Sequence, residues 1–314
     1  MKIMKEPLAP IVLFVYNRPI HTKQTVEGLL QNPEAKDSIL YIFADGPKKN
    51  AKQSDLEKIK ETRSYIHTIK GFKDIIIKES DCNKGLANST IEGCTNVINQ
   101  HGKMIMIEDD DIPTKYFLSY VNRCLEKYAN DESIWCVSGY VDNKLLPAYG
   151  DDDLFLVRRP SSWGFGTWKR CWDKVIWDVP TLKGLFKHRD IIRGYNKWAG
   201  IDSSEIMFGL FKGIYSSWSI RYNLGAYLNN SLTILPNKSL IKNTGTDGSG
   251  THCEGQELKL QYFDRDVIIP EEIKYDQIRN TQLMKSFIPH SFGGKLLYYL
   301  GLYNWVKIHF IYKV

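Results

Sequence analysis

Hydrophobic runs alternate with amphipathic stretches along the first 130 residues. Short apolar runs bounded by polar turns predict buried strands at Pro10–Tyr16, Ser38–Ala44, Lys73–Lys78 and Lys103–Ile107. Helical periodicity between and after these runs predicts helices near His21–Leu30, Ser54–Ile66, Leu86–Ile98 and Thr114–Tyr128. This βαβα alternation predicts an α/β fold, in which helices flank a mostly parallel central sheet.

The alternation breaks down after residue 130. Ile134–Ser138 predicts one more strand and Ile201–Phe211 a helix, with the Gly/aromatic segment Trp163–Trp168 between them. Asn243–Thr251 is rich in glycine and polar residues, so we expect a flexible loop there.

Four consecutive acids follow the strand expected at Lys103–Ile107, namely Glu108, Asp109, Asp110 and Asp111. Carboxylates held this close repel one another, and a hard cation such as Mn²⁺ or Mg²⁺ would neutralise them. Ligands of open α/β sheets bind at the carboxyl ends of the strands, so the run predicts a metal site that would bind a diphosphate. The alternative is a solvated turn, in which Asp111 or Thr114 caps a helix starting near Pro113. Capping explains one acid, not four.

Polar loops also follow the other predicted strands. They are Tyr16–Arg18, Asp45–Pro47 and Asp81–Gly85, and all three are expected at the same edge of the sheet. At that edge Arg18 could stack on or pair with a nucleotide base, and Asp45 could accept a hydrogen bond from it. The alternatives are a surface ion pair for Arg18 and a turn with Gly46 for Asp45.

Composition and charge narrow the range of partners. The net charge of +6 suits anionic ligands, but the chain has no dense basic run of the kind expected of a nucleic-acid binder. Six scattered cysteines form no CxxC pair, which argues against zinc and disulfide frameworks and favours a reducing compartment. The apolar run Ile11–Tyr16 is too short for a signal peptide, so we expect a cytoplasmic protein without a transmembrane span.

The last segment, Phe287–Val314, interleaves leucine, tyrosine and tryptophan with lysine. A basic, aromatic-rich helix can lie in a membrane interface, so an anionic membrane surface is one expected partner. The alternative is a helix that docks on the core or in an oligomer.

Taken in order, four stretches of the chain resemble the GT-A class of glycosyltransferases. They are Pro10–Pro19, Ile107–Asp111, Ile134–Ser138 and Leu235–Leu240, and the resemblance covers roughly residues 8–256. The pattern is most similar to the family typified by N-acetylglucosaminyltransferase I and its bacterial relatives. It implies a GT-A fold, a nucleotide-sugar donor and a DXD-type motif that binds Mn²⁺ or Mg²⁺.

The resemblance also implies roles for single residues. Arg18 and Asp45 would border the nucleotide base, with Tyr16 in the same loop, and Asn83, Lys84 and Gly85 would approach the donor diphosphate or ribose. Asp110 would be the direct metal ligand, with Glu108 and Asp109 contacting ribose and sugar. His252, after the glycine-rich loop, is a second candidate metal ligand, against the alternative of a structural histidine.

The catalytic base departs from the family pattern. An inverting transferase needs a carboxylate to take the proton of the acceptor hydroxyl, and in the related family an Asp just before a Trp supplies it. Here Ser217 precedes Trp218, so the base falls to Asp202 or Glu205 nearby. The alternative makes Asp202 a helix N-cap and Glu205 its capping-box partner.

These observations favour a metal-dependent glycosyltransferase, and we expect it to move one sugar from a UDP-sugar to a lipid-linked glycan in bacterial surface polysaccharide synthesis. We expect a catalytic domain over residues 1–256, with a nucleotide-binding half at 1–130, an acceptor-side half at 131–256, and a C-terminal extension at 257–314. One alternative is a sugar-1-phosphate nucleotidyltransferase, although Asn17-Arg18-Pro19 lacks the glycine-rich loop of those enzymes. Another is a degenerate glycan-binding module, because the acid expected near Ser217 is missing.

Overall fold

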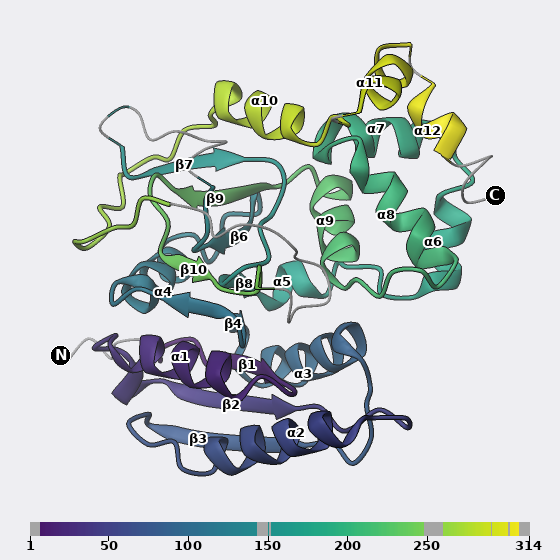
Figure 1. Ribbon diagram of the computed structural model, residues 1–314. Coiled ribbons are helices and arrows are strands. Elements are labelled where there is room, and N and C mark those ends of the chain that lie inside the picture. The colour runs from purple at the N-terminus through teal and green to yellow at the C-terminus, as the bar shows by residue number, and fades with distance from the viewer. Residues whose placement is uncertain are drawn as a thin grey trace.

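The computed structural model describes residues 7–142, 150, 152–247, 260–289, 291–300 and 302–307 (Figure 1). Within these residues, eight strands form one sheet in the order β3-β2-β1-β4-β8-β6-β9-β7. Their bounds are β1 Ile11–Val15, β2 Ile39–Ala44, β3 Asp74–Glu79, β4 Lys103–Glu108, β6 Ile134–Ser138, β7 Leu154–Val157, β8 Phe165–Trp168 and β9 Leu232–Pro236. Strands β7 and β8 run antiparallel to their neighbours, and the other six are parallel to one another.

Helices cover both faces of the sheet. Along the chain the helices are α1 Pro19–Leu30, the 3₁₀ turn η1 Ala35–Asp37, α2 Gln53–Ile66, α3 Leu86–His101, α4 Phe117–Lys127, α5 Lys169–Trp172, α6 Val179–Leu185, α7 Arg189–Ala199, α8 Asp202–Phe211, α9 Ser219–Leu228, α10 Gln277–Ser286, α11 Phe292–Tyr299 and α12 Tyr303–Val306. Helices α1, α2 and α4 pack on one face, and α3, α5 and α9 on the other. The expected α/β fold with a mostly parallel, helix-flanked sheet is confirmed.

Close packing explains the glycine in the Gly/aromatic segment. Gly166 lies in β8 between β4 and β6, and a Cβ there would lie 2.4 Å from Cγ1 of Val121 on α4. On the opposite face of the same strand, the ring of Phe165 stacks on Trp218. The segment is therefore a central strand, which its mixed composition did not reveal.

A second, two-stranded sheet corrects the helix boundary expected near residue 114. Asp111–Pro113 forms strand β5, which pairs antiparallel with β10 at Ile241–Asn243. Helix α4 therefore begins only at Phe117, and Tyr116 is its N-cap residue. Asp111 and Thr114 cap no helix here, so the capping alternative is wrong.

The strand order creates a topological switch point. From β1 the chain passes outward to β2 and β3, then returns to add β4 on the other side of β1. Strands β1 and β4 are paired in parallel, with Phe14 opposite Glu108. A switch point of this kind, at the carboxyl ends of the strands, is where open α/β sheets bind ligands.

The described part of the C-terminal extension lies along the second half of the fold. Helix α10 packs against α7 and β7, and Figure 1 shows α11 and α12 beside α7 and α8. None of the described helices has the length and apolar content needed to cross a bilayer.

Candidate functional site

The four acids gather at the switch point, where β4 ends and β5 begins. One carboxylate oxygen from each of Glu108, Asp110 and Asp111 lies within 4.8 Å of the others. Asp109, Asp110 and Asp111 are 4%, 8% and 0% exposed, and Glu108 is half-buried. The run of acids is therefore a compact buried cluster and not a solvated turn.

Burial makes ionisation of this cluster costly. It raises the pKa of Glu108 to about 8, and the charges of Asp110 and Asp109 add to the increase. It likewise raises the pKa of Asp111 well above its ordinary value, with contributions from Asp110 and Glu108. The pKa of Asp109 rises to about 6, because burial outweighs the opposing charge of Arg18. A cation bound among these acids would lower the cost of ionising them.

Arg18 supplies part of the missing positive charge. Its Nη2 and Nε donate to the two carboxylate oxygens of Asp109, and its Nη1 donates to Oδ2 of Asp110 at 2.8 Å. The guanidinium lies just after β1, at the amino end of α1. It links this loop to the acids at the end of β4, the neighbouring strand. Arg18 is therefore engaged with the acids in this structure, rather than free to stack on a nucleotide base.

One oxygen of the cluster remains unsatisfied. Oδ1 of Asp110 is fully buried and has no hydrogen-bond partner among the described residues, although Oδ2 of the same carboxylate accepts from Arg18. Buried carboxylate oxygens nearly always have a partner, so an orphaned one indicates a missing ligand. Glu108, Asp110 and Asp111 together offer hard oxygen donors, which suit Mg²⁺ or Mn²⁺. The residues present fit a divalent cation.

The glycine-rich loop begins on top of the acids. Asn243 donates from Nδ2 to Oδ1 of Asp111 at 2.9 Å, and the backbone N–H of Thr244 donates to the carbonyl of Asp110 at 2.8 Å. A Cβ at Gly245 would lie 2.2 Å from Oδ2 of Asp110, so only glycine fits there. His252, the expected second ligand, lies outside the described residues.

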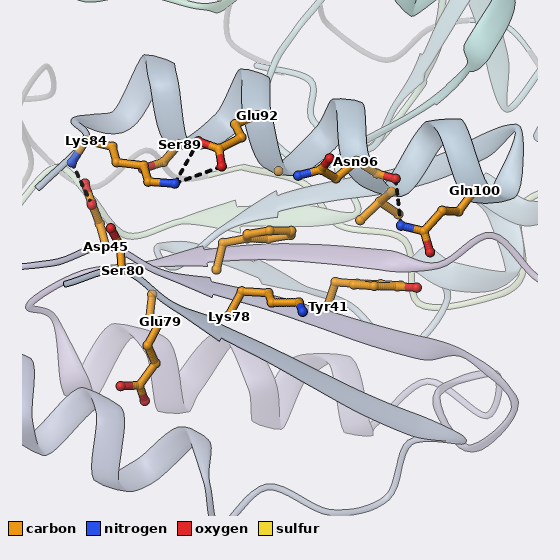
Figure 2. Close-up of a pocket in the computed structure, with 14 residues that line it drawn as sticks. Tyr41, Asp45, Lys78, Glu79, Ser80, Lys84, Ser89, Glu92, Asn96 and Gln100 are labelled. Atoms are coloured by element: carbon orange, nitrogen blue, oxygen red, sulfur yellow. Dashed lines mark hydrogen bonds and ion pairs between the residues drawn. The ribbon is translucent and has the colours of Figure 1, made fainter. Parts of the chain in front are cut away.

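Asp45 organises the loop after β3. Its Oδ1 accepts from the backbone N–H groups of Gly46 and Lys84, and its Oδ2 accepts from Gly85 N–H and the Asn83 amide. Figure 2 shows the contact with Lys84. A carboxylate has about four acceptor positions, and this one uses four for its own loop. Asp45 therefore holds Asn83, Lys84 and Gly85 in place, and direct pairing with a base does not fit this conformation.

Tyr16 lies beside the same loop. Burial raises the pKa of its phenol, and the charges of Asp55 and Asp45 contribute. The neighbouring Asn17 donates to Oδ1 of Asp55 at 3.2 Å. The loops after β1, β2 and β3 thus meet at one edge of the sheet, as the sequence predicted.

A pocket of about 420 Å³ lies between α3 and strands β2 and β3 (Figure 2). Asp45 and Lys84 are at one end of it, where Lys84 is paired with Glu92 on α3. None of the four acids lines this pocket. It adjoins the Asp45 loop but is separate from the acid cluster.

Asp202 and Glu205 make ion pairs elsewhere in the second half of the fold. The guanidinium of Arg159 donates to both oxygens of Asp202 at 2.7 and 2.9 Å. The Cζ atom of Arg159 lies 3.7 Å from the centroid of the Phe287 ring. Glu205 accepts from Tyr303 and Lys307, which belong to the C-terminal extension. Ile201 is the N-cap residue of α8, and the Ser204 N–H in the first turn donates to Oδ1 of Asn196, so the expected capping box does not form.

Trp218 joins the second half of the chain to the acids. Its indole Nε1 donates to Oε1 of Glu108 at 3.4 Å, which places Ser217 and the start of α9 next to the cluster. Ser217, where the resemblance led us to expect an acid, is therefore next in the chain to a residue that contacts the cluster. Our assignment of the metal ligands omitted Asp111, although it stood in the acid run, and no local signal marked Trp218, Asn243 or Thr244 as neighbours of the acids.

Comparison with known proteins gives only weak likenesses. No protein-family profile and no curated protein matches the chain. A solved structure of the mannosyltransferase PcManGT from Pyrobaculum calidifontis, in complex with GDP-Man and Mn²⁺, aligns with a TM-score of 0.37 at 8% identity, over 55% of this chain and 47% of that one. S. aureus TarS aligns with a TM-score of 0.36 at 11% identity, over 76% of this chain and 37% of that one. The chain thus spans less than half the length of either protein, and TM-scores this low are no evidence for its activity.

Proposed function

We propose that the protein is a metal-dependent glycosyltransferase of the GT-A type that uses a nucleotide-sugar donor. The observation that carries the proposal is the buried acid cluster at the switch point, with the orphaned Oδ1 of Asp110 at its centre. Glu108, Asp110 and Asp111 would hold Mn²⁺ or Mg²⁺, and the metal would neutralise the diphosphate as it leaves. The position of the cluster, at the carboxyl ends of β1 and β4, is where such a donor would bind.

The chain's own residues would orient the donor. The amino end of α3 follows directly on Gly85, and backbone N–H groups at a helix amino end favour phosphate. Asp45 fixes that approach by holding the Asn83–Gly85 loop. Arg18 would keep Asp109 ionised while the metal takes the remaining acids. Asn243 would keep the carboxylate of Asp111 in place.

The finer assignments are proposals as well. We propose a UDP-sugar as the donor and a lipid-linked glycan as the acceptor, in bacterial surface polysaccharide synthesis. A nucleotidyltransferase would need a loop that cradles a triphosphate after β1, and that position holds Arg18 turned onto the acids. One observation favours a non-catalytic glycan-binding module. Position 217, just before the Trp218 that bonds Glu108, holds a serine instead of an acid. Transfer or hydrolysis of a UDP-sugar with added Mn²⁺ would distinguish the glycosyltransferase from the binding module.

Replacing Asp110 tests the metal assignment. In Asp110→Asn we expect the stabilisation by Mn²⁺ with UDP to disappear, because the carboxylate with the orphaned oxygen is lost. For the unchanged protein, ligand at about 100 times its dissociation constant adds about 2.7 kcal/mol of stability, measured by thermal unfolding. Asp173→Asn, which removes an exposed acid paired with Lys169, is the matched control. An undiminished Mn²⁺-dependent shift in Asp110→Asn would refute the assignment.

A second substitution decides between catalytic and structural roles for Asp202. Because both of its oxygens are bound by Arg159, we expect Asp202→Asn to lower the free energy of unfolding by about 1–3 kcal/mol. Arg159→Met should cost a similar amount, and the two losses should not add. We expect little change in turnover per folded molecule. A fall in kcat of about 100-fold or more with unchanged stability would instead identify Asp202 as the base. Asp190→Asn, on the surface of α7, is the control.

Membrane attachment follows from the exposed face of α11. Phe292, Leu296 and Tyr299 are 86%, 50% and 76% exposed, and their spacing places them on one side of the helix, close to Lys295. We propose that this face enters the headgroup region of an anionic membrane and holds the enzyme beside a lipid-linked acceptor.

Liposome co-sedimentation tests this attachment. We expect Phe292→Ser with Leu296→Ser to weaken binding to anionic vesicles by about 10-fold or more, because two apolar side chains that would enter the membrane are lost. Binding of the unchanged protein should weaken in high salt. Ile20→Ser, which removes an equally exposed side chain from α1, is the control. Equal partitioning of all three proteins would contradict attachment, and a loss of dimer in the double variant would show that the face binds a second copy.

A further inference from the structure

Strand β3 ends the eight-stranded sheet and has no partner on its outer side. It is first in the sheet order, at the lower edge in Figure 1, and among the described residues it pairs only with β2. Its three central residues, Ile75, Ile76 and Ile77, are only half-buried, whereas all five residues of β1 are buried. The strand also keeps a regular register with β2 and contains no proline. An exposed, regular and apolar edge of this kind is a template on which another strand can pair.

The backbone of β3 directs Ile75 and Ile77 outward. The N–H of Ser80, just after the strand, donates to the carbonyl of Ala44 at the end of β2. Because successive residues of a strand direct their N–H and C=O groups to opposite sides, the backbone groups of residues 74, 76 and 78 face β2 as Ser80 does. Those of Ile75 and Ile77 face away, and the N–H of Ile75 accordingly donates to the side chain of Asp74 and not to β2. A further strand would pair with these two isoleucines.

Charged residues flank the isoleucines in an order that is complementary to its own reverse. From residue 73 to residue 79 the chain reads Lys-Asp-Ile-Ile-Ile-Lys-Glu. When two copies run antiparallel about Ile76, Asp74 of one lies opposite Lys78 of the other. One residue further out, Lys73 lies opposite Glu79. Each pair occurs twice by symmetry, and unlike charges directly opposite one another stabilise paired strands.

Asp74 and Lys78 are placed to make these contacts. Both are exposed, and Lys78 makes no ion pair within the described residues. Lys78 lines the pocket beside α3, where Figure 2 shows it near Tyr41, and burial and the charge of Asp74 raise the pKa of Tyr41. Asp74 and Lys78 therefore lie on the same face of β3. Glu79 lies on the other face, where Arg63 of α2 pairs with it at 3.1 Å, so it has less charge to offer a second copy.

Only one register satisfies both the backbone and the charges. A shift by one residue would set outward-facing groups opposite groups that already bond β2, and the ladder would not form. A shift by two residues would place Asp74 or Lys78 opposite Ile76, where neither finds an opposite charge. Charged side chains on an edge usually prevent pairing with other strands. Here they would act in that way against unrelated strands, but favour a second copy of β3 in this register.

We propose that two copies of the chain associate through β3, paired antiparallel about Ile76, so that their sheets become one continuous sheet. Ile75 of each copy would then pair with Ile77 of the other, and the half-buried isoleucines would lose contact with water. The paired strands run in opposite directions, so the two acid clusters at the carboxyl ends of β4 would face opposite ways. The association is thus independent of the proposed function, since neither copy adds a residue to the other's cluster.

Sedimentation velocity over a range of protein concentrations tests the association. We expect the unchanged protein to dimerise, and Asp74→Lys or Lys78→Asp to weaken dimerisation about 10-fold or more, because two attractive contacts become repulsive. Both side chains are exposed, so neither substitution should alter the thermal unfolding of the monomer. Lys187→Asp, the same charge reversal at an exposed residue after α6, is the control and should dimerise as the unchanged protein does.

Charge complementation distinguishes this interface from a dimer that is lost for another reason. In an equimolar mixture of the two single variants, Lys at position 74 and Lys78 of one chain again face acids of the other. We therefore expect a heterodimer from two variants that are monomeric alone. The double variant, Asp74→Lys with Lys78→Asp, restores both pairs in one chain and should dimerise again. Misfolding of a single variant would not be reversed in this way.

A disulfide cross-link tests the register. Ile76 would face its own copy across the symmetry axis in a non-hydrogen-bonded pair, whose Cα atoms are about 4.5 Å apart. A disulfide can span that distance, so we expect Ile76→Cys to form a linked dimer on mild oxidation. Ile75→Cys, which would face Ile77, should not link. The unchanged protein controls for the exposed thiol of Cys82.

Three results would overturn the inference. The first is a protein that stays monomeric at every concentration, which would leave the edge of β3 to a strand from another protein. The second is a dimer that Asp74→Lys and Lys78→Asp both retain, and its loss in Phe292→Ser with Leu296→Ser would then assign it to α11. The third is a mixture of the two single variants that remains monomeric. Failure of the proposed function would appear only as absent donor turnover, and these measurements of association do not depend on it.

Discussion

Repulsion among four carboxylates at the end of β4 is the constraint on which the surrounding structure depends. Buried like charges cannot all ionise near neutral pH, and the raised pKa of Glu108, about 8, expresses that cost. Arg18 offsets part of the charge, but it reaches only Asp109 and one oxygen of Asp110. The remaining deficit lies at Glu108, Asp111 and the free oxygen of Asp110, which is the set that a divalent cation would neutralise.

Several otherwise unrelated features follow from holding these acids together. Strand β5 directs Asp111 back toward Glu108 instead of letting a helix carry it away, and β10 keeps β5 in place. Asn243 and Thr244 satisfy the side chain of Asp111 and the backbone of Asp110, so the end of β10 helps to hold the acids in place. Trp218, just before α9, bonds Glu108 through its indole and so ties the second half of the chain to the same cluster.

The sequence predicted the first half of the fold well, because its signals were local. Apolar runs and helical periodicity gave β1 to β4 and α1 to α3, and the acid run identified the site. Strand β8 was missed because a glycine required by α4 breaks its apolar pattern at Gly166. The side-chain partners could not be predicted, since they depend on tertiary contacts. Asp45 uses its acceptors within its own loop, Arg18 turns onto the acids, and Asp202 is bound by Arg159 from 43 residues away.

The central claim is that Glu108, Asp110 and Asp111 form a divalent cation site. Anomalous diffraction at the manganese edge, from crystals grown with Mn²⁺ and UDP, tests it most directly. The account predicts one strong anomalous peak bounded by these three carboxylates, with the diphosphate on its open side. A peak elsewhere, or an acid cluster that stays free of metal while UDP is bound, would contradict it.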